Sequence, residues 1–202
     1  MALLAGITWF ALALQLKLSL DTTSATGFTA LKTVINFFSY FTILCNLLVA
    51  VSLTSSLLLP RSALGSFFSA PIVTSAIALY IFIVGLVYNL VLRNIWEPTG
   101  WQLVADNLLH VIVPLLYVLY WIFFTPKQTL HWKNILPWLI FPALYLGYSL
   151  IRGTVDNWYP YPFVDVSKLG YAKVAVNSLL VLAAIISVGA GMVAINRRGK
   201  IS

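Results

Sequence analysis

Six long apolar segments set the strongest constraint on how this chain of 202 residues can fold. A helix needs about 20 mostly apolar residues to cross the hydrocarbon of a bilayer. Breaks that carry proline, glycine or charge separate the segments, as at Pro60-Arg61 and Glu97-Pro98. The segments occupy residues 1–20, 34–59, 70–92, 106–124, 135–151 and 171–195. The sequence therefore predicts an all-α, polytopic membrane protein, a bundle of six transmembrane helices forming a single domain over residues 1–202.

Charged residues are too few to cover the surface of a soluble domain. They make up 8% of the chain, against about 25% in soluble proteins, while hydrophobic residues reach 61%. This composition excludes a soluble enzyme, a disordered tail and a nucleic-acid module. The net charge of +7 comes from basic residues that are scattered singly, without the cluster that a phosphate backbone requires. The one cysteine can form neither an intrachain disulfide nor a cysteine zinc site.

Three other architectures are less compatible with the pattern. The first segment could be a signal peptide, but it has no basic start and no clear cleavage site, so we expect a retained span. Strand-like alternation never persists long enough for a membrane barrel. We also find no internal repeat of the inverted kind that marks many transporters.

Loop charge predicts how the helices are oriented. Basic residues divide equally between the two sides, six on each, while all the acids lie on the side of loops one, three and five. The compact basic tail Arg197-Arg198-Gly199-Lys200 favours cytoplasmic termini. We therefore expect an integral, multi-pass protein of a bacterial cell membrane with both termini in the cytoplasm.

Polar residues gather at one end of five predicted helices. Successive spans alternate in direction, so helices two, four and six begin on the side where three and five end. The residues are Ser39, Thr42 and Asn46 in the second segment, Asn89 in the third, Asp106, Asn107 and His110 in the fourth, Tyr148 and Arg152 in the fifth, and Lys173 and Asn177 in the sixth. Because polar groups in hydrocarbon are costly, their agreement predicts a polar pocket there. The alternatives are interhelical hydrogen bonds and side chains that reach the headgroups.

His110 is the histidine that lies inside a span, and imidazole can act as a general base near neutral pH. Asp106, one turn earlier, could orient its ring. Pro114 has no N–H, so the His110 carbonyl loses its helical partner and a kink is expected. The alternative is a histidine that is simply hydrogen-bonded within the membrane core.

Thr42 is a candidate nucleophile, with Ser39 and Cys45 as competitors. A hydroxyl needs an adjacent base, and His110 would serve if the two helices pack together. Alternatively, the threonine hydroxyl bonds its own helix backbone. Neither a Gly-x-Ser-x-Gly turn nor a His-Glu-x-x-His motif is present, so we expect no metal and no cofactor.

The fifth loop is dense in aromatic residues and prolines, from Trp158 through Tyr159 and Tyr161 to Phe163. It could act as a semi-rigid lid or a lipid-facing entrance to the pocket. The alternative is an interfacial belt that anchors the neighbouring helices.

The chain resembles the androgen-induced, six-span integral-membrane hydrolases and their bacterial relatives. The segments that carry the resemblance are Phe41-Thr42-Ile43-Leu44, Asn107-Leu108-Leu109-His110-Val111-Ile112-Val113-Pro114, and Trp158-Tyr159-Pro160-Tyr161-Pro162-Phe163 with Asp165 beyond it. The resemblance implies hydrolysis of fatty acid esters of hydroxy fatty acids. It assigns the catalytic roles of a helix-two threonine and a helix-four histidine to Thr42 and His110.

Three hypotheses follow from these observations. The leading one is a threonine-dependent lipid esterase whose partners are membrane lipids and a lipid ester substrate. The candidates for stabilising an oxyanion are Asn46, Asn107, Asn177 and Arg152, and those for holding a lipid carboxylate are Arg152 and Lys173. The second is a non-enzymatic lipid- or small-molecule-binding protein, or a transporter, that uses the same pocket. The third is a structural subunit whose polar face meets a partner.

Overall fold

The computed structural model describes residues 1–95 and 97–198, and this part of the chain contains helices joined by turns and loops, without a strand. Six helices within it are long and apolar enough to cross a membrane: Ala2–Asp21, Phe41–Leu58, Pro71–Leu92, Gly100–Phe124, Trp132–Asp156 and Val166–Arg198. The all-α class and the multi-pass membrane character are thereby confirmed. Of the basic tail, Gly199 and Lys200 lie outside the described residues.

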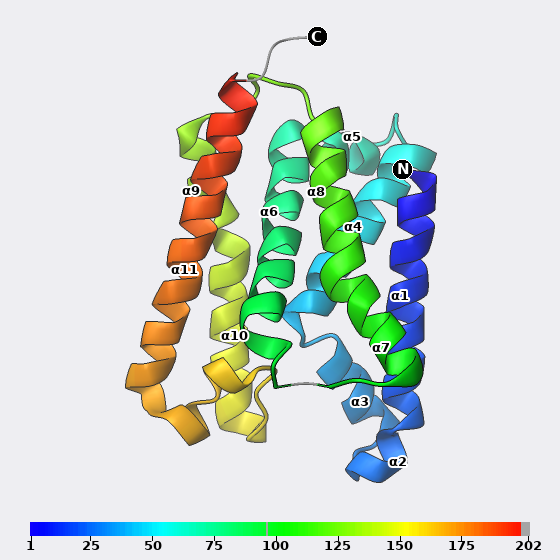
Figure 1. Ribbon diagram of the computed structural model, residues 1–202, viewed down its shortest axis with the longest axis vertical. Helices are drawn as coiled ribbons and strands as arrows, with labels where there is room; N and C mark the ends of the chain where they lie inside the picture. Colours follow the sequence, from blue (N-terminus) through cyan, green and yellow to red (C-terminus); the bar gives the residue numbers. More distant parts are fainter. Residues whose placement is uncertain (96, 199–202) are drawn as a thin grey trace. The chain divides into compact units, whose positions relative to one another are not determined.

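The chain divides into two compact units, Met1–Pro126 and Lys127–Ser202, and each is described by itself. The single domain over residues 1–202 therefore stays a prediction. The first unit consists of α1 (Ala2–Asp21), α2 (Thr23–Thr26), α3 (Ala30–Phe37), α4 (Phe41–Leu58), α5 (Ala63–Ser69), α6 (Pro71–Val87), η1 (Tyr88–Leu92), α7 (Gly100–Asn107), η2 (Leu108–Ile112) and α8 (Val113–Phe124). Within it α1 packs on α4, α4 on α6, and α6 on α8 (Figure 1).

Several helices of the first unit begin at residues suited to a helix start. The hydroxyl of Thr29 accepts a hydrogen bond from the Lys32 amide at the start of α3, and that of Ser62 accepts one from the Gly65 amide at the start of α5. Pro71 occupies the first turn of α6, where its missing N–H costs nothing. These capping residues indicate where the helices begin, which the apolar pattern alone does not.

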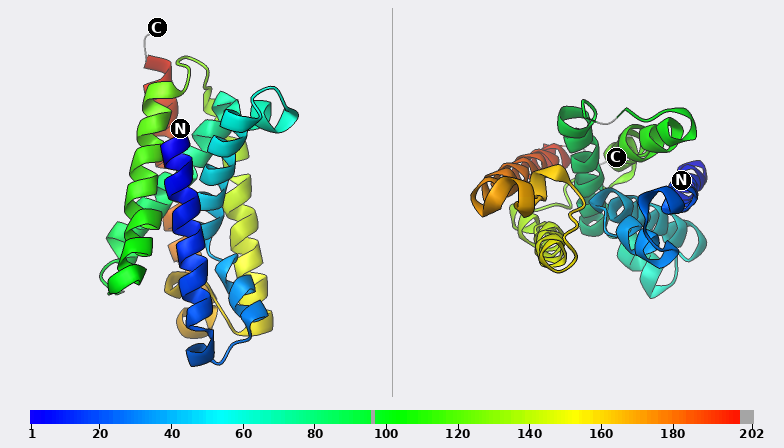
Figure 2. Two further views of the ribbon diagram at one scale, coloured as in Figure 1. Left: turned by 90° about the vertical axis from the view of Figure 1, so that its right-hand side faces the viewer. Right: turned by 90° about the horizontal axis from the view of Figure 1, so that it is seen from below.

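The second apolar segment is two helices rather than the single span predicted over residues 34–59. Helix α3 ends at Phe37, Tyr40 is extended, and α4 begins at Phe41 (Figure 2). At the break the Ser39 hydroxyl donates to the Ile35 carbonyl at 2.6 Å, and the Ser39 amide donates to the Asn36 carbonyl only three residues back. This is a tighter turn than that of an α-helix. Ser39 is therefore not part of the α4 face that carries Thr42 and Asn46.

The second unit contains η3 (Trp132–Asn134), α9 (Ile135–Trp138), α10 (Ile140–Asp156), η4 (Pro162–Val164) and α11 (Val166–Arg198). Helix α11 begins five residues before the predicted start and has a kink at Gly170, whose φ of 73° is left-handed. The loop after residue 126 is tied to the far end of α11, because Asn196 Oδ1 accepts from the amides of Thr129 and Leu130. Near the other end, Asn177 donates to the Phe163 carbonyl at 2.9 Å.

Candidate functional site

Thr42 and His110 lie in contact in the first unit. Thr42 stands in the first turn of α4, and His110 lies in the middle of η2. The distance from Thr42 Oγ1 to His110 Nε2 is 3.3 Å. Thr42 is buried, at 7% exposure, and the His110 side chain is 16% exposed. The two residues named as nucleophile and base therefore have the proximity that proton transfer between them requires.

Asp106 determines which nitrogen of His110 carries the proton. The His110 Nδ1 atom lies 3.0 Å from the Asp106 carbonyl oxygen and 3.2 Å from its carboxylate Oδ1. Both of these atoms are acceptors, so Nδ1 is the donor. In neutral imidazole this leaves Nε2 as the acceptor for the Thr42 hydroxyl. Threonine, histidine and aspartate thus stand in the order of a nucleophile, a base and the group that orients the base.

Tyr88 completes this arrangement, although the sequence pattern did not identify Tyr88 as a candidate. The Tyr88 ring is stacked on the His110 imidazole, with centroids 4.2 Å apart and planes 14° apart. Its hydroxyl donates to Asp106 Oδ2. Tyr88 is buried at 4% exposure, one residue before Asn89 at the predicted polar end of the third span. Its position next to Asn89 could have indicated a role at the site. A tyrosine in a span is, however, usually assigned to an interfacial belt.

The backbone around His110, where the sequence predicted a kink, forms a wide π-helical turn. Pro114 has no N–H to offer the His110 carbonyl, and the Val113 amide reaches back five residues to Leu108. Such π-helical turns are often found at functional sites. Gly85 of α6 faces the turn, because a Cβ there would lie 3.2 Å from the His110 carbonyl oxygen and 3.3 Å from Pro114 Cβ. The glycine permits the close approach of α6 to the histidine.

Asn46 links α4 to the same turn. Its fully buried side-chain amide donates to the Thr42 carbonyl at 2.8 Å and to the Leu109 carbonyl at 3.1 Å. Both amide hydrogens are therefore used by carbonyl groups. In this structure Asn46 holds together the segments that carry Thr42 and His110, and its role as an oxyanion donor stays a prediction.

The other predicted polar residues of the first unit bond within their own segments. The Asn89 amide donates to the Gly85 carbonyl, and Asn89 Oδ1 accepts from Arg93 at 3.0 Å. The Asn107 amide donates to the Leu103 carbonyl at 3.0 Å. Cys45 is a buried free thiol. These asparagine bonds stay within one segment, so they are not the bonds between helices that were the alternative to a shared pocket.

Arg152 is the centre of a second polar cluster, which belongs to the second unit. It is 8% exposed, and its guanidinium lies 4.4 Å from the centre of the Trp158 ring. Its Nε atom lies 3.4 Å from Asp156 Oδ2, and Nη1 lies 3.4 Å from the Tyr148 hydroxyl. The arginine is thus surrounded by an aromatic face and hydrogen-bonding oxygens of its own unit.

The aromatic loop is ordered by contacts inside the second unit. The Tyr159 ring covers Gly153 of α10, and Tyr161 stacks on Phe163 with centroids 5.2 Å apart. Lys173 is exposed on α11. Since the two units are described separately, a lid over Thr42 and a pocket shared by five helices both stay predictions.

Asp165, next to this loop, caps the start of α11. Its Oδ1 atom accepts from the Ser167 amide at 3.1 Å and from the Ser167 hydroxyl at 2.5 Å, and Lys168 Nζ lies 3.5 Å from Oδ2. Burial raises the pKa of this carboxyl, but the hydrogen bonds from Ser167 and Lys168 and the lysine charge lower it by more. The net result is a pKa below the ordinary value of 3.8, so the carboxylate form is favoured.

Neither a protein-family model nor a curated protein nor a solved structure matches the chain. The resemblance to the androgen-induced hydrolases therefore rests on the short segments around Thr42, His110 and Trp158 alone.

Proposed function

We propose that the protein is an intramembrane, threonine-dependent hydrolase of lipid esters and belongs with the androgen-induced hydrolases. One observation carries the proposal: Thr42 Oγ1 lies 3.3 Å from His110 Nε2, while the opposite nitrogen of the ring faces Asp106. A threonine whose hydroxyl only bonded its own helix would need neither His110 as a base nor Asp106 to orient that base. The arrangement is what an activated hydroxyl requires.

The reaction proceeds in two steps through an acyl-enzyme. The Thr42 hydroxyl gives its proton to His110 Nε2, and Oγ1 attacks the ester carbonyl carbon. The bond to the alcohol oxygen breaks, and the leaving alcohol takes the proton from Nε2. Water then gives a proton to Nε2 and attacks the acyl carbon. The bond from that carbon to Oγ1 breaks, Oγ1 takes the proton back from Nε2, and the carboxylic acid leaves. Asp106 holds the ring and stabilises the imidazolium formed in each step.

The position of the pair supports a lipid as the substrate. Thr42 belongs to the candidate span Phe41–Leu58, and His110 belongs to Gly100–Phe124. A molecule that partitions into the bilayer has direct access to residues carried by two spans. An ester of a hydroxy fatty acid has a scissile bond between apolar parts, so it meets this condition.

We further propose a bacterial cell membrane and cytoplasmic termini. Arg197 and Arg198 in the last turn of α11 support the orientation, because basic residues are retained on the cytoplasmic side. Reporter fusions to the carboxyl end test it. A fluorescent protein should be active there, and an alkaline phosphatase fusion should be inactive. The reverse result would invert the topology.

Labelling by a fluorophosphonate probe in native membranes tests the activity. Wild type should be labelled, and Thr42→Val should not be labelled because it lacks the nucleophilic oxygen. His110→Ala keeps the hydroxyl but loses its base, so its labelling rate should fall by about 10² to 10⁴. Thr42→Ser should retain labelling because it keeps a hydroxyl. The matched control is Thr8→Ala, since the buried Thr8 hydroxyl donates only to the Leu4 carbonyl of its own helix at 2.8 Å.

Two outcomes would contradict the proposal. Labelling that persists in Thr42→Val would move the nucleophile elsewhere. An unlabelled wild type that is folded and hydrolyses no lipid ester would favour the binding or transport hypothesis, in which Thr42 needs no acidity.

A further inference from the structure

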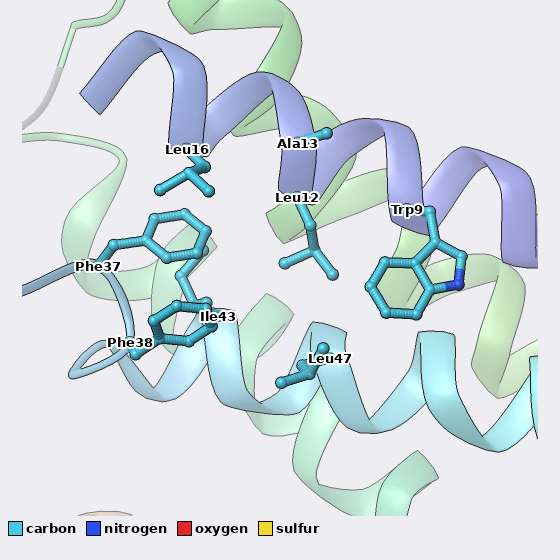
Figure 3. A pocket seen from close by; sticks show the side chains of 8 residues that line it. All are labelled: Trp9, Leu12, Ala13, Leu16, Phe37, Phe38, Ile43 and Leu47. Carbon is cyan, nitrogen blue, oxygen red and sulfur yellow. The ribbon is translucent and has the colours of Figure 1, made fainter. Parts of the chain in front are cut away.

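We propose that a groove between α1 and α4 holds the acyl chain of the ester, and that Trp9 limits the length of chain it accepts. This inference rests on the proposed function, because it assigns a substrate part to the Thr42–His110 pair. The groove encloses about 230 Å³ and is lined entirely by apolar and aromatic side chains (Figure 3). Those used below are Trp9, Leu12 and Leu16 of α1, Phe37 of α3, and Ile43 and Leu47 of α4.

One end of the groove lies near the reacting pair, although neither Thr42 nor His110 lines it. Ile43 directly follows Thr42 in α4, and its side chain lines the groove. The same apolar cluster contains Leu12, Phe37 and Ile43 together with Leu109, the residue before His110. The walls of the groove are thus built on the segments that carry the nucleophile and the base. We expect a chain in the groove to direct its carboxyl end toward Thr42.

Trp9 lies at the other end. In Figure 3, Leu16 and Phe37 lie on one side of the groove and Trp9 on the opposite side, with Leu12 and Leu47 between them. The Trp9 indole N–H donates to the Thr54 hydroxyl at 3.0 Å, which joins α1 to α4 and fixes the ring. Leu16 and Trp9 are separated by about 10 Å along the helix axis, at 1.5 Å per residue. The groove is therefore short and has a defined end.

The lining selects an alkyl chain over other ligands. None of the lining side chains carries a charge, and a polar or ionic ligand would lose its hydration without gaining a partner. Both α1 and α4 are candidate spans, so the groove opens into hydrocarbon. A chain there already lies in an apolar solvent, so its selection depends on close packing with the walls. Trp9 is 42% exposed, which leaves a lateral route from the bilayer.

A series of fluorogenic esters of increasing acyl length tests the role of Trp9. We expect wild type to prefer one length, and Trp9→Ala to raise kcat/KM for longer chains relative to shorter ones by about tenfold or more. Ala13→Phe, which adds a ring to the lining between Leu16 and Trp9, should shift the preference to shorter chains. The control is Phe10→Ala, because Phe10 neighbours Trp9, is 52% exposed and does not line the groove. Equal length profiles in wild type, Trp9→Ala and Ala13→Phe would overturn the inference.

A binding measurement separates this inference from the proposed reaction. A fatty acid with a diazirine at its methyl end is photocrosslinked to Thr42→Val in membranes, and the modified peptides are mapped by mass spectrometry. Modification should concentrate on α1 and α4 around Trp9 and fall in Ala13→Phe. Such labelling, together with a wild type that hydrolyses no ester, would support the groove and contradict the hydrolase. Ester hydrolysis with labelling spread evenly over all lipid-facing helices would reject the groove and retain the hydrolase.

Discussion

Asn46 of α4 donates its side-chain amide to the Leu109 carbonyl, 63 residues further along the chain, at 3.1 Å. Within the wide turn η2 that carbonyl has lost its ordinary donors, because the Val113 amide is bonded to Leu108 and Pro114 has none. Asn46 satisfies a backbone group that the proline left unpaired. The bond also joins the two segments whose spacing sets the distance from Thr42 to His110.

We expect Asn46→Ala to destabilise the first unit by about 1–3 kcal/mol, the cost of a buried carbonyl without a donor. Thermal unfolding in detergent measures the change, and fluorophosphonate labelling should fall with it because α4 is released from η2. Asn107→Ala is the control, since its amide bonds only within its own helix and its loss should cost less than about 0.5 kcal/mol. Equal unfolding temperatures for the two variants would contradict the linking role.

Tyr88→Phe should separate the contribution of the Tyr88 hydroxyl from the contribution of its ring. The variant keeps the stacking on His110 but removes the donor to Asp106, and a buried carboxylate oxygen without its donor costs about 1–3 kcal/mol. We expect kcat for ester hydrolysis to fall about tenfold with KM little changed, because Tyr88 positions the base rather than binding substrate. Steady-state kinetics in mixed micelles measure kcat and KM separately. A rise in KM alone would indicate that Tyr88 contacts the substrate instead.

Gly85→Ala should disturb the site without altering any polar group. The added Cβ would meet the His110 carbonyl at 3.2 Å and Pro114 at 3.3 Å, so α6 and η2 must separate by a few tenths of an ångström. We expect a stability loss of about 1–3 kcal/mol, as for other overpacked positions, together with reduced labelling. Gly191→Ala in α11 is the control, because a Cβ there has nothing within 4 Å and alanine should favour the helix. A neutral or stabilising Gly85→Ala would show that the close approach is not needed.

Asp165 should make the start of α11 sensitive to acid. Its folded-state pKa lies below the ordinary value of 3.8, so the charged cap stabilises the fold fully above that value. The stabilisation is lost as the pH falls through the folded-state pKa. At neutral pH Asp165→Ala should cost about 1 kcal/mol, a usual value for a lost helix cap, and the difference from wild type should shrink at low pH.

Thermal midpoints at neutral and acidic pH test this dependence. Asp21→Ala serves as a control, because the Lys17–Asp21 ion pair is exposed to solvent and should contribute less than about 1 kcal/mol at any pH. A difference between Asp165→Ala and wild type that stays constant down to acidic pH would contradict the prediction.

The sequence predicted the elements of this fold that depend on local pattern. Apolar length identified all six spans, since crossing hydrocarbon requires a run of apolar residues that is visible without any contact. The apolar pattern failed at residues 38–40, where α3 has ended and α4 has not yet begun although the run stays apolar. Pro114 predicted a disturbed backbone at His110, and the structure shows a wide π-helical turn there that Gly85 and Asn46 contact.

By itself, the sequence determined the membrane-spanning class and named Thr42, His110 and Asp106 as residues of interest. Only the tertiary structure decided that they meet, that Tyr88 joins them, and that the Asn46 amide is used by carbonyls. The physical reason is that helical periodicity specifies which residues share a face of one helix. Which faces meet depends on packing between segments more than 60 residues apart, as with Thr42 and His110, and no local pattern encodes that choice.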